Sequence, residues 1–98
     1  MSQYATSVRF LVKDGKAGEF LHRVKKNPNL VETYSHTVQT GDLTFLWNAI
    51  FESEQALIDA RPTMIANLDR LRDLLQVISP KLGVTDPVSG RIVFELQS

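Results

Sequence analysis

The sequence predicts one α+β domain whose strands and helices follow the order βαββαβ. Three observations lead to this fold class. The chain has 98 residues, close to the usual size of one domain. Its composition, 43% hydrophobic and 22% charged, is that of a folded protein. Segments with the period-two alternation of strands are interspersed with segments that have the 3.6-residue periodicity of amphipathic helices.

The charge balance and the absence of cysteine exclude several classes of function. Eleven basic side chains balance eleven acidic ones, so there is no electrostatic case for nucleic acid or an anionic membrane as a partner. The chain has no cysteine, which excludes disulfides, thiolate metal sites and cysteine nucleophiles. No stretch resembles a signal peptide or reaches transmembrane length, and we therefore expect a cytoplasmic protein.

The first strand is expected at Ser7–Lys13, where apolar residues occupy alternate positions. Asp14 follows the strand and is predicted to cap the first helix. That helix carries an apolar stripe, at spacing i, i+3, i+4 and i+7, for one face of the sheet. The stripe residues are Ala17, Phe20, Leu21 and Val24.

The next two strands are predicted to form an antiparallel hairpin around the turn at Gly41. The segment Val31–Gln39 is polar for a strand, which indicates an edge position. The segment Thr44–Phe51 is the most apolar of the chain and is apolar on both faces, so it should lie centrally in the sheet. One of its faces combines Phe45, Trp47, Ala49 and Phe51.

The remaining elements are a second helix and a last strand. Ser53 is the expected N-cap of the second helix, and Arg61-Pro62 is expected to break or kink it, with a second piece over Pro62–Val77. A turn is predicted at Asp86–Gly90 and the last strand at Arg91–Leu96.

This order of elements fits a ferredoxin-like antiparallel sheet with both helices on one face and the first and third strands in the centre. We expect the opposite face to carry Val8, Phe10, Trp47 or their neighbours and to be open to water in a monomer. Burying about 500 Å² of such a surface contributes roughly 10 kcal/mol before the costs of association. The sequence therefore predicts a homodimer formed through the sheet face.

Two segments resemble the dimeric α+β barrel group, and within it the antibiotic biosynthesis monooxygenase (ABM) domains. They are Val8–Phe20, an extended strand followed by Lys-Asp-Gly-Lys and a helix with Glu-Phe, and Ile50–Leu57, the end of the third strand and the next helix start. The resemblance implies a homodimer of the whole chain, residues 1–98, with a cavity for a flat aromatic compound. Some members oxidise such a compound with molecular oxygen and no cofactor, and others bind haem.

The residues that ABM members use are matched only in part. Members usually have tryptophan directly before the Glu-Ser-Glu helix start, where this chain has Phe51. Haem-degrading members take an axial histidine from the second helical region, and Ala56–Val77 contains none. The sequence therefore predicts neither a cofactor nor a metal site.

Two polar residues are the candidate catalytic groups. Asn48 lies in a strand that is apolar on both faces, where an amide without partners would cost about 1–3 kcal/mol. It could orient a substrate carbonyl or bond to a polar neighbour such as Arg9 or Thr44. His36, on the polar second strand, could face the cavity as a base or be solvated.

The candidate ligand-binding residues are mainly aromatic, and Arg9 is the charged member of the set. The aromatic residues, which could stack on a planar ligand or pack in the core, are Phe10, Phe45, Trp47 and Phe51. Arg9 could anchor an anionic ligand or pair with a carboxylate. Three hypotheses follow: a cofactor-independent monooxygenase acting on a small aromatic or polyketide-type compound, a non-catalytic binding protein, or a dimer without a small ligand whose cavity is filled by Phe and Trp side chains.

Overall fold

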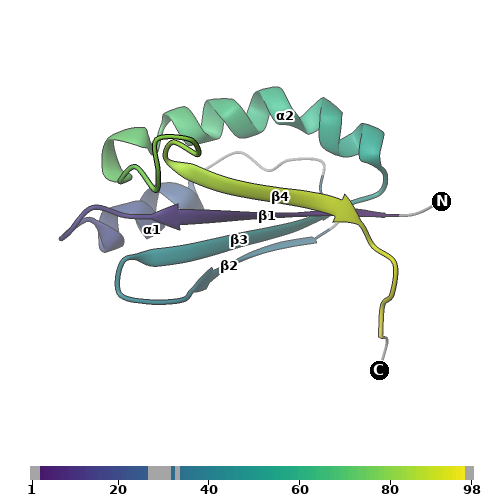
Figure 1. Cartoon of the computed structure of the whole chain (residues 1–98), viewed down its shortest axis with the longest axis horizontal. Helices are drawn as coiled ribbons and strands as arrows, with labels where there is room; N and C mark the ends of the chain where they lie inside the picture. The colour runs from purple at the N-terminus through teal and green to yellow at the C-terminus, as the bar shows by residue number, and fades with distance from the viewer. Residues whose placement is uncertain (1–2, 27–31, 33, 97–98) are drawn as a thin grey trace.

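The computed structural model describes residues 3–26, 32 and 34–96, and it has the predicted βαββαβ order with one added 3₁₀ turn (Figure 1). The elements are β1 (Tyr4–Leu11), α1 (Ala17–Lys25), β2 (Tyr34–Gln39), β3 (Thr44–Phe51), α2 (Glu54–Asp69), η1 (Arg72–Leu74) and β4 (Thr85–Arg91). The predicted α+β class is confirmed. The predicted start of the second strand at Val31 lies outside the described residues.

The strands form one antiparallel sheet in the order β2-β3-β1-β4. The predicted central positions of the first and third strands, β1 and β3, are confirmed, as is the polar edge position of β2. The predicted hairpin is also present, since Gln39 pairs with Phe45 across the turn that contains Gly41. These pairings fix which side chains share a face of the sheet.

The face that packs against the helices carries the even-numbered residues of β1 and the odd-numbered residues of β3. In the register Val8 is opposite Trp47 and Phe10 is opposite Phe45, and the ring of Phe10 lies 5.6 Å from that of Phe20 on α1. The prediction placed Val8, Phe10, Trp47 or their neighbours on the face away from the helices. The first alternative is therefore wrong, and the neighbouring residues of each strand lie on that face. Both faces of these strands carry apolar residues, and the sequence pattern alone does not determine which face the helices pack against.

Two groups of buried side chains hold the helices on this face. The first joins β1 and β3 to α1 and the η1 region through Val12, Phe20, Phe45, Leu71, Leu74 and Leu75. The second joins β3 to the first half of α2 through Ala49, Phe51, Leu57 and Ala60. The N-terminal half of α2 is thus packed on β3. After the C-terminal end of α2, the chain packs on the sheet and α1 through the first group.

The predicted break of the second helix at Pro62 and its extension to Val77 are both wrong. α2 continues through Pro62 and ends at Asp69, and Leu75 is already in extended conformation. A helix stripe would have the i, i+3, i+4 spacing of Leu71, Leu74 and Leu75. All three side chains are buried, but they belong to the 3₁₀ turn and to the residues directly before and after it. The chain then pairs with the end of β1, where the Gln76 amide donates to the Leu11 carbonyl at 2.7 Å.

The last strand also differs from the prediction. The segment Asp86–Gly90, expected as a turn, forms the middle of β4, and Arg91–Leu96 is not a strand beyond Arg91. Pro87 lies within β4 opposite Val8. This position is compatible with proline because β4 is at the edge of the sheet, where a strand can lack one amide donor.

The two predicted helix caps have different outcomes. The Ser53 hydroxyl accepts a hydrogen bond from the Ala56 amide at 3.1 Å, which confirms this residue as the N-cap of α2. Asp14 does not cap α1, because the helix begins one residue after Lys16, whose side chain makes no capping bond. The first strand begins at Tyr4 and ends at Leu11, three and two residues earlier than expected.

Candidate functional site

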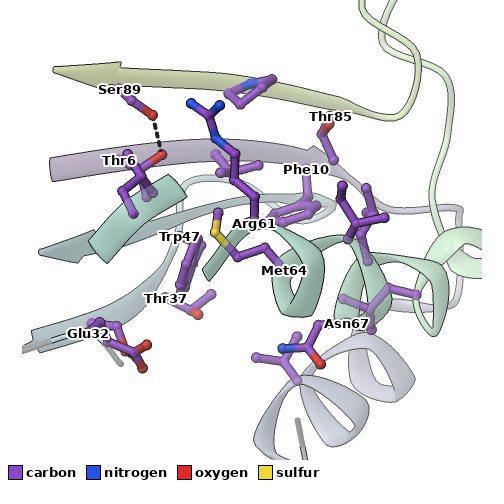
Figure 2. Close-up of a pocket in the computed structure, with 18 of the residues that line it drawn as sticks. Thr6, Phe10, Glu32, Thr37, Trp47, Arg61, Met64, Asn67, Thr85 and Ser89 are labelled. Carbon is purple, nitrogen blue, oxygen red and sulfur yellow. Dashed lines mark hydrogen bonds between the residues drawn. The ribbon is translucent and has the colours of Figure 1, made fainter. Parts of the chain in front are cut away.

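A cavity of about 640 Å³ lies between the helices and the sheet (Figure 2). Its helical wall is formed mainly by α2, through Leu57, Arg61, Met64, Ile65, Asn67 and Leu68. Its sheet wall includes Thr6, Val8 and Phe10 of β1, Trp47 of β3, and Thr85 and Ser89 of β4. The volume is in the range of cavities that hold small organic molecules.

The packing of α2 explains why space remains here. Leu57 and Ala60 of α2 are buried against β3, whereas Met64 and Ile65, one turn later, line the cavity. Opposite this part of the helix the sheet presents the short side chains of Thr6 and Val8. The middle of α2 therefore spans a region that the side chains below it do not fill.

Aromatic and aliphatic side chains dominate the surface of the cavity. Figure 2 shows the indole of Trp47 and the ring of Phe10 on the sheet wall, with Met64 of α2 between them in this view. Trp47 is partly buried, in contrast to its neighbours Phe45 and Phe51, which have no solvent exposure. A flat apolar molecule could lie against the indole and make offset ring contacts.

Two charged side chains border the cavity without strong partners among the described residues. Oε2 of Glu32 is buried and has no hydrogen-bond partner, while its Oε1 accepts a 3.5 Å bond from Ser35. Arg61 has neither an ion pair nor a hydrogen bond within the described ranges. In Figure 2 Arg61 extends from α2 toward β4, and Glu32 lies on the side of β2 near Thr37.

Several of the other polar groups of the cavity are engaged with each other or with the protein, whereas the hydroxyls of Thr37 and Thr85 have no side-chain hydrogen bond among the described residues. The hydroxyls of Thr6 and Ser89 lie 2.8 Å apart, as the dashed line in Figure 2 marks. Asn67 accepts a 3.3 Å hydrogen bond from Arg70 through Oδ1. Glu32 and Arg61 are therefore the groups with the most unused capacity to bind a ligand.

The predicted aromatic residues are divided between the cavity and the core. Trp47 and Phe10 line the cavity. Phe45 packs against Phe20 with ring centroids 4.7 Å apart, and Phe51 packs against Leu57 in the second buried group. The hypothesis of a dimer with no small ligand expected Phe and Trp to fill the cavity, whereas these rings leave it open.

The predicted catalytic residues meet on the opposite face of the sheet, the outer face. A chain of side-chain hydrogen bonds crosses β1, β3 and β2 there: Ser7 Oγ donates to Asn48 Oδ1 at 2.6 Å, and the Asn48 amide lies 3.1 Å from His36 Nε2. His36 Nδ1 lies 3.1 Å from the Tyr34 hydroxyl. If the imidazole is neutral and Nε2 accepts from Asn48, then Nδ1 carries the proton and donates to Tyr34.

Arg9 lies on the outer face as well and forms an ion pair with Asp86 at 3.0 Å. Of the two predicted partners for Arg9, an anionic ligand or a carboxylate, the structure shows the carboxylate. Asn48 uses Ser7 and His36 as partners rather than Arg9 or Thr44. His36 also borders the cavity, since β2 forms part of its rim.

Sequence reasoning did not find the charged residues of the cavity. The sequence predicts a helix break at Pro62, and only the unbroken helix places the adjacent Arg61 over the sheet. Glu32 lies within the segment Val31–Gln39, which the sequence predicts as a polar edge strand. Nothing in the local pattern indicates that its carboxylate turns inward, because that depends on the path of the chain before β2.

A cluster of ion pairs around Arg23 lies away from the cavity and joins α1 to the chain after α2. Arg23 donates to Asp73 at 2.7 Å, to Glu19 at 3.0 Å and to the Arg70 carbonyl at 2.9 Å. The hydrogen bond from Arg23 lowers the pKa of Asp73 below its ordinary value, and the bonds to Asp73 and Glu19 raise the pKa of Arg23. This cluster stabilises the helical layer and does not touch a ligand.

The described residues contain no group of three or more histidine, cysteine or acidic side chains arranged to hold a metal ion. None of the helices in residues 3–26 and 34–96 is long and apolar enough to cross a membrane.

Comparisons with known proteins place the fold. No protein-family profile matches the sequence, and a search of curated proteins finds no match. Among solved structures, SnoaB, a cofactor-independent oxygenase from Streptomyces nogalater, is 14% identical, has a TM-score of 0.74 and matches over 100% of both chains. A dimeric ferredoxin-like protein from an uncultured marine organism is 8% identical, with a TM-score of 0.76 over 100% of this chain and 94% of that one.

A third structure, from Nitrosomonas europaea, is provisionally described as an antibiotic biosynthesis monooxygenase. It is 15% identical, with a TM-score of 0.74, and the match covers 94% of this chain and 91% of that one. Other matched structures are of unknown function. At these identities the likeness concerns the fold: the chain has the ferredoxin-like α+β fold of ABM-like monooxygenases and of dimeric ferredoxin-like proteins.

Proposed function

We propose that this protein binds a small planar aromatic compound in the cavity between α2 and the sheet. The observation that carries the proposal is the 640 Å³ cavity, whose surface is mainly apolar and includes Trp47 and Phe10. Ligand sites of this kind combine apolar walls with a few polar groups that fix orientation. Glu32 and Arg61 supply such groups here.

Titration calorimetry tests this proposal with 2-naphthol, a flat two-ring probe. Binding with one site per chain is expected, and replacing Met64 with Trp should abolish it by filling the cavity. Exposed Ile58 is also on α2 but does not line the cavity, so Ile58→Trp is the matched control and should bind as the wild type does. Equal affinities of both variants, or no heat of binding to wild type, would contradict the proposal.

We also propose that two copies associate through the outer face of the sheet. This face carries Leu46 and Ile50 of β3 with more exposed apolar residues on the edge strands, Val38 (42%) and Val88 (67%). A sheet that is apolar on both faces is normally covered on both. Two solved structures of this fold are described as dimeric, which supports the association of two copies.

A second candidate function is oxidation of the bound aromatic compound by molecular oxygen without a cofactor. It is favoured by the unpartnered Oε2 of Glu32 in the cavity, since a substrate that donates electrons to oxygen must first lose a proton to a base. In such a reaction a ring CH₂ becomes C=O, one atom of O₂ enters the product, and the other leaves as water with the two hydrogens. The substrate supplies the electrons.

The predicted catalytic residues, Asn48 and His36, belong to this second candidate. Their hydrogen-bonded chain would lie between the two sheets of a dimer, and a catalytic role there requires substrate to reach that space. Oxygen uptake with a polycyclic aromatic ketone that carries a ring CH₂ tests the activity. Asn48→Ala and His36→Ala should then lower turnover and leave the melting temperature unchanged, whereas a loss of stability with unchanged turnover would assign the chain a structural role.

A further inference from the structure

We propose that the cavity selects an elongated aromatic compound with a hydroxyl at one end and an acidic group at the other. Glu32 would accept a hydrogen bond from the hydroxyl, and Arg61 would bind the acid. This inference rests on the proposed ligand binding and adds the chemical class of the ligand. Two charged side chains that border the cavity, Glu32 and Arg61, carry the inference. Neither has a strong hydrogen bond or an ion pair with another described residue.

Glu32 requires a donor. Its Oε2 is buried and unpartnered, and its Oε1 has only the 3.5 Å contact with the Ser35 hydroxyl. A buried carboxylate oxygen without a hydrogen bond is strongly unfavourable, because it loses its water and gains nothing in return. A ligand hydroxyl in the cavity would satisfy it. An acidic group at this end would instead be repelled.

Arg61 is exposed at the border of the cavity and can offer its guanidinium to a ligand. Most other arginines of the described chain have an acceptor: Arg9 pairs with Asp86, Arg23 with Asp73, and Arg72 with Asp69. Arg61 extends from α2 toward β4 (Figure 2) and forms no ion pair with a carboxylate of the described residues. Its planar guanidinium matches a carboxylate in two parallel hydrogen bonds. An anionic group is therefore the natural occupant of this end.

The sheet order sets the shape of the ligand. Glu32 lies on the β2 side of the cavity and Arg61 extends toward β4, and these are the two edges of the sheet. Three strand spacings of roughly 4.8 Å, or about 14 Å in all, separate the edges. A molecule with polar groups at opposite ends of two fused rings spans such a distance better than a single ring. Trp47, on β3 between the edges, would contact the rings.

The experiment compares three probes by calorimetry: 6-hydroxy-2-naphthoate, 2-naphthoate without the hydroxyl, and 2-naphthol without the acid. Wild type should bind the first probe at least about tenfold more tightly than either of the others, as expected for a charge-assisted hydrogen bond. Arg61→Met should remove the advantage of the acid and leave the affinity for 2-naphthol unchanged. Glu32→Leu should remove the advantage of the hydroxyl and leave 2-naphthoate bound equally or more tightly.

Arg91→Met is the matched control, because Arg91 is likewise unpaired within the described ranges but does not line the cavity. It should retain all three affinities. Circular dichroism of each variant shows whether it is folded. Equal affinities of the three probes for wild type would overturn this inference while leaving the proposed function standing. Failure of every probe to bind wild type would overturn both.

Discussion

Phe45 and Trp47 offer a direct comparison between a core residue and a cavity residue. They lie two positions apart on the same face of β3, but Phe45 is fully buried against Phe20 whereas Trp47 borders the cavity. Phe45→Ala removes a closely packed ring and should lower the free energy of unfolding by about 3–5 kcal/mol. Trp47→Ala removes a partly buried ring that borders the cavity, and we expect a loss of about 2 kcal/mol or less.

Urea unfolding followed by far-ultraviolet circular dichroism measures both losses, since it does not depend on the tryptophan. For a domain of this size 1 kcal/mol corresponds to roughly 4–8 °C in melting temperature, so thermal unfolding gives a second estimate. If Phe45→Ala does not fold, Phe45→Leu gives a smaller loss that is still measurable. An equal cost for Trp47→Ala and Phe45→Ala would show that Trp47 is packed on all sides, and the cavity argument would then be refuted.

Three further predictions concern a helix cap, an ion pair and the outer face. Ser53→Ala should lower the free energy of unfolding by about 1 kcal/mol, measured in urea, because the Ala56 amide loses its acceptor; no change would mean that water replaces the cap. The lowered pKa of Asp73 means that its ionised form stabilises the fold above its ordinary pKa of 3.8, and this contribution is lost as pH falls below that value. Asp73→Asn should therefore lower the melting temperature at neutral pH and approach wild type in acid, while a pH-independent difference would contradict this assignment. Leu46→Glu should convert the proposed dimer into a folded monomer in analytical ultracentrifugation, because it places a charge in the centre of the outer face; an unchanged mass would place the interface elsewhere.

The sequence predicted those parts of the fold that depend on strong local patterns. The run of apolar residues in β3 placed that strand at the centre of the sheet, and the position of Ser53 before Glu54 identified the start of α2. Gly41 identified the hairpin turn. These features depend on period and on capping chemistry, which act over a few residues and are visible without the rest of the molecule.

The errors came from patterns that two structures satisfy equally well. Leucines 71, 74 and 75 have helical spacing, yet a 3₁₀ turn followed by an extended residue buries them as well. Pro87 suggested a turn, but an edge strand tolerates proline. In each case long-range packing against β1 decided between the alternatives.

The cavity could not be predicted for a related reason. The alternation of apolar and polar residues correctly predicts which residues share a face with Val8 and with Trp47. It does not predict whether that face is the one covered by α1 and α2. Once that face is known, the short side chains of Thr6 and Val8 below Met64 explain the space. The position of Arg61 over the cavity then follows from the continuity of α2 through Pro62.

The most direct test of the central claim is a crystal structure of the protein with bound 6-hydroxy-2-naphthoate. The rings should lie between α2 and the sheet against Trp47, with the hydroxyl at Glu32 and the carboxylate at Arg61. A ligand bound only at the outer face beside Asn48 and His36, or an α2 packed closely on β1 with no space between them, would contradict the account.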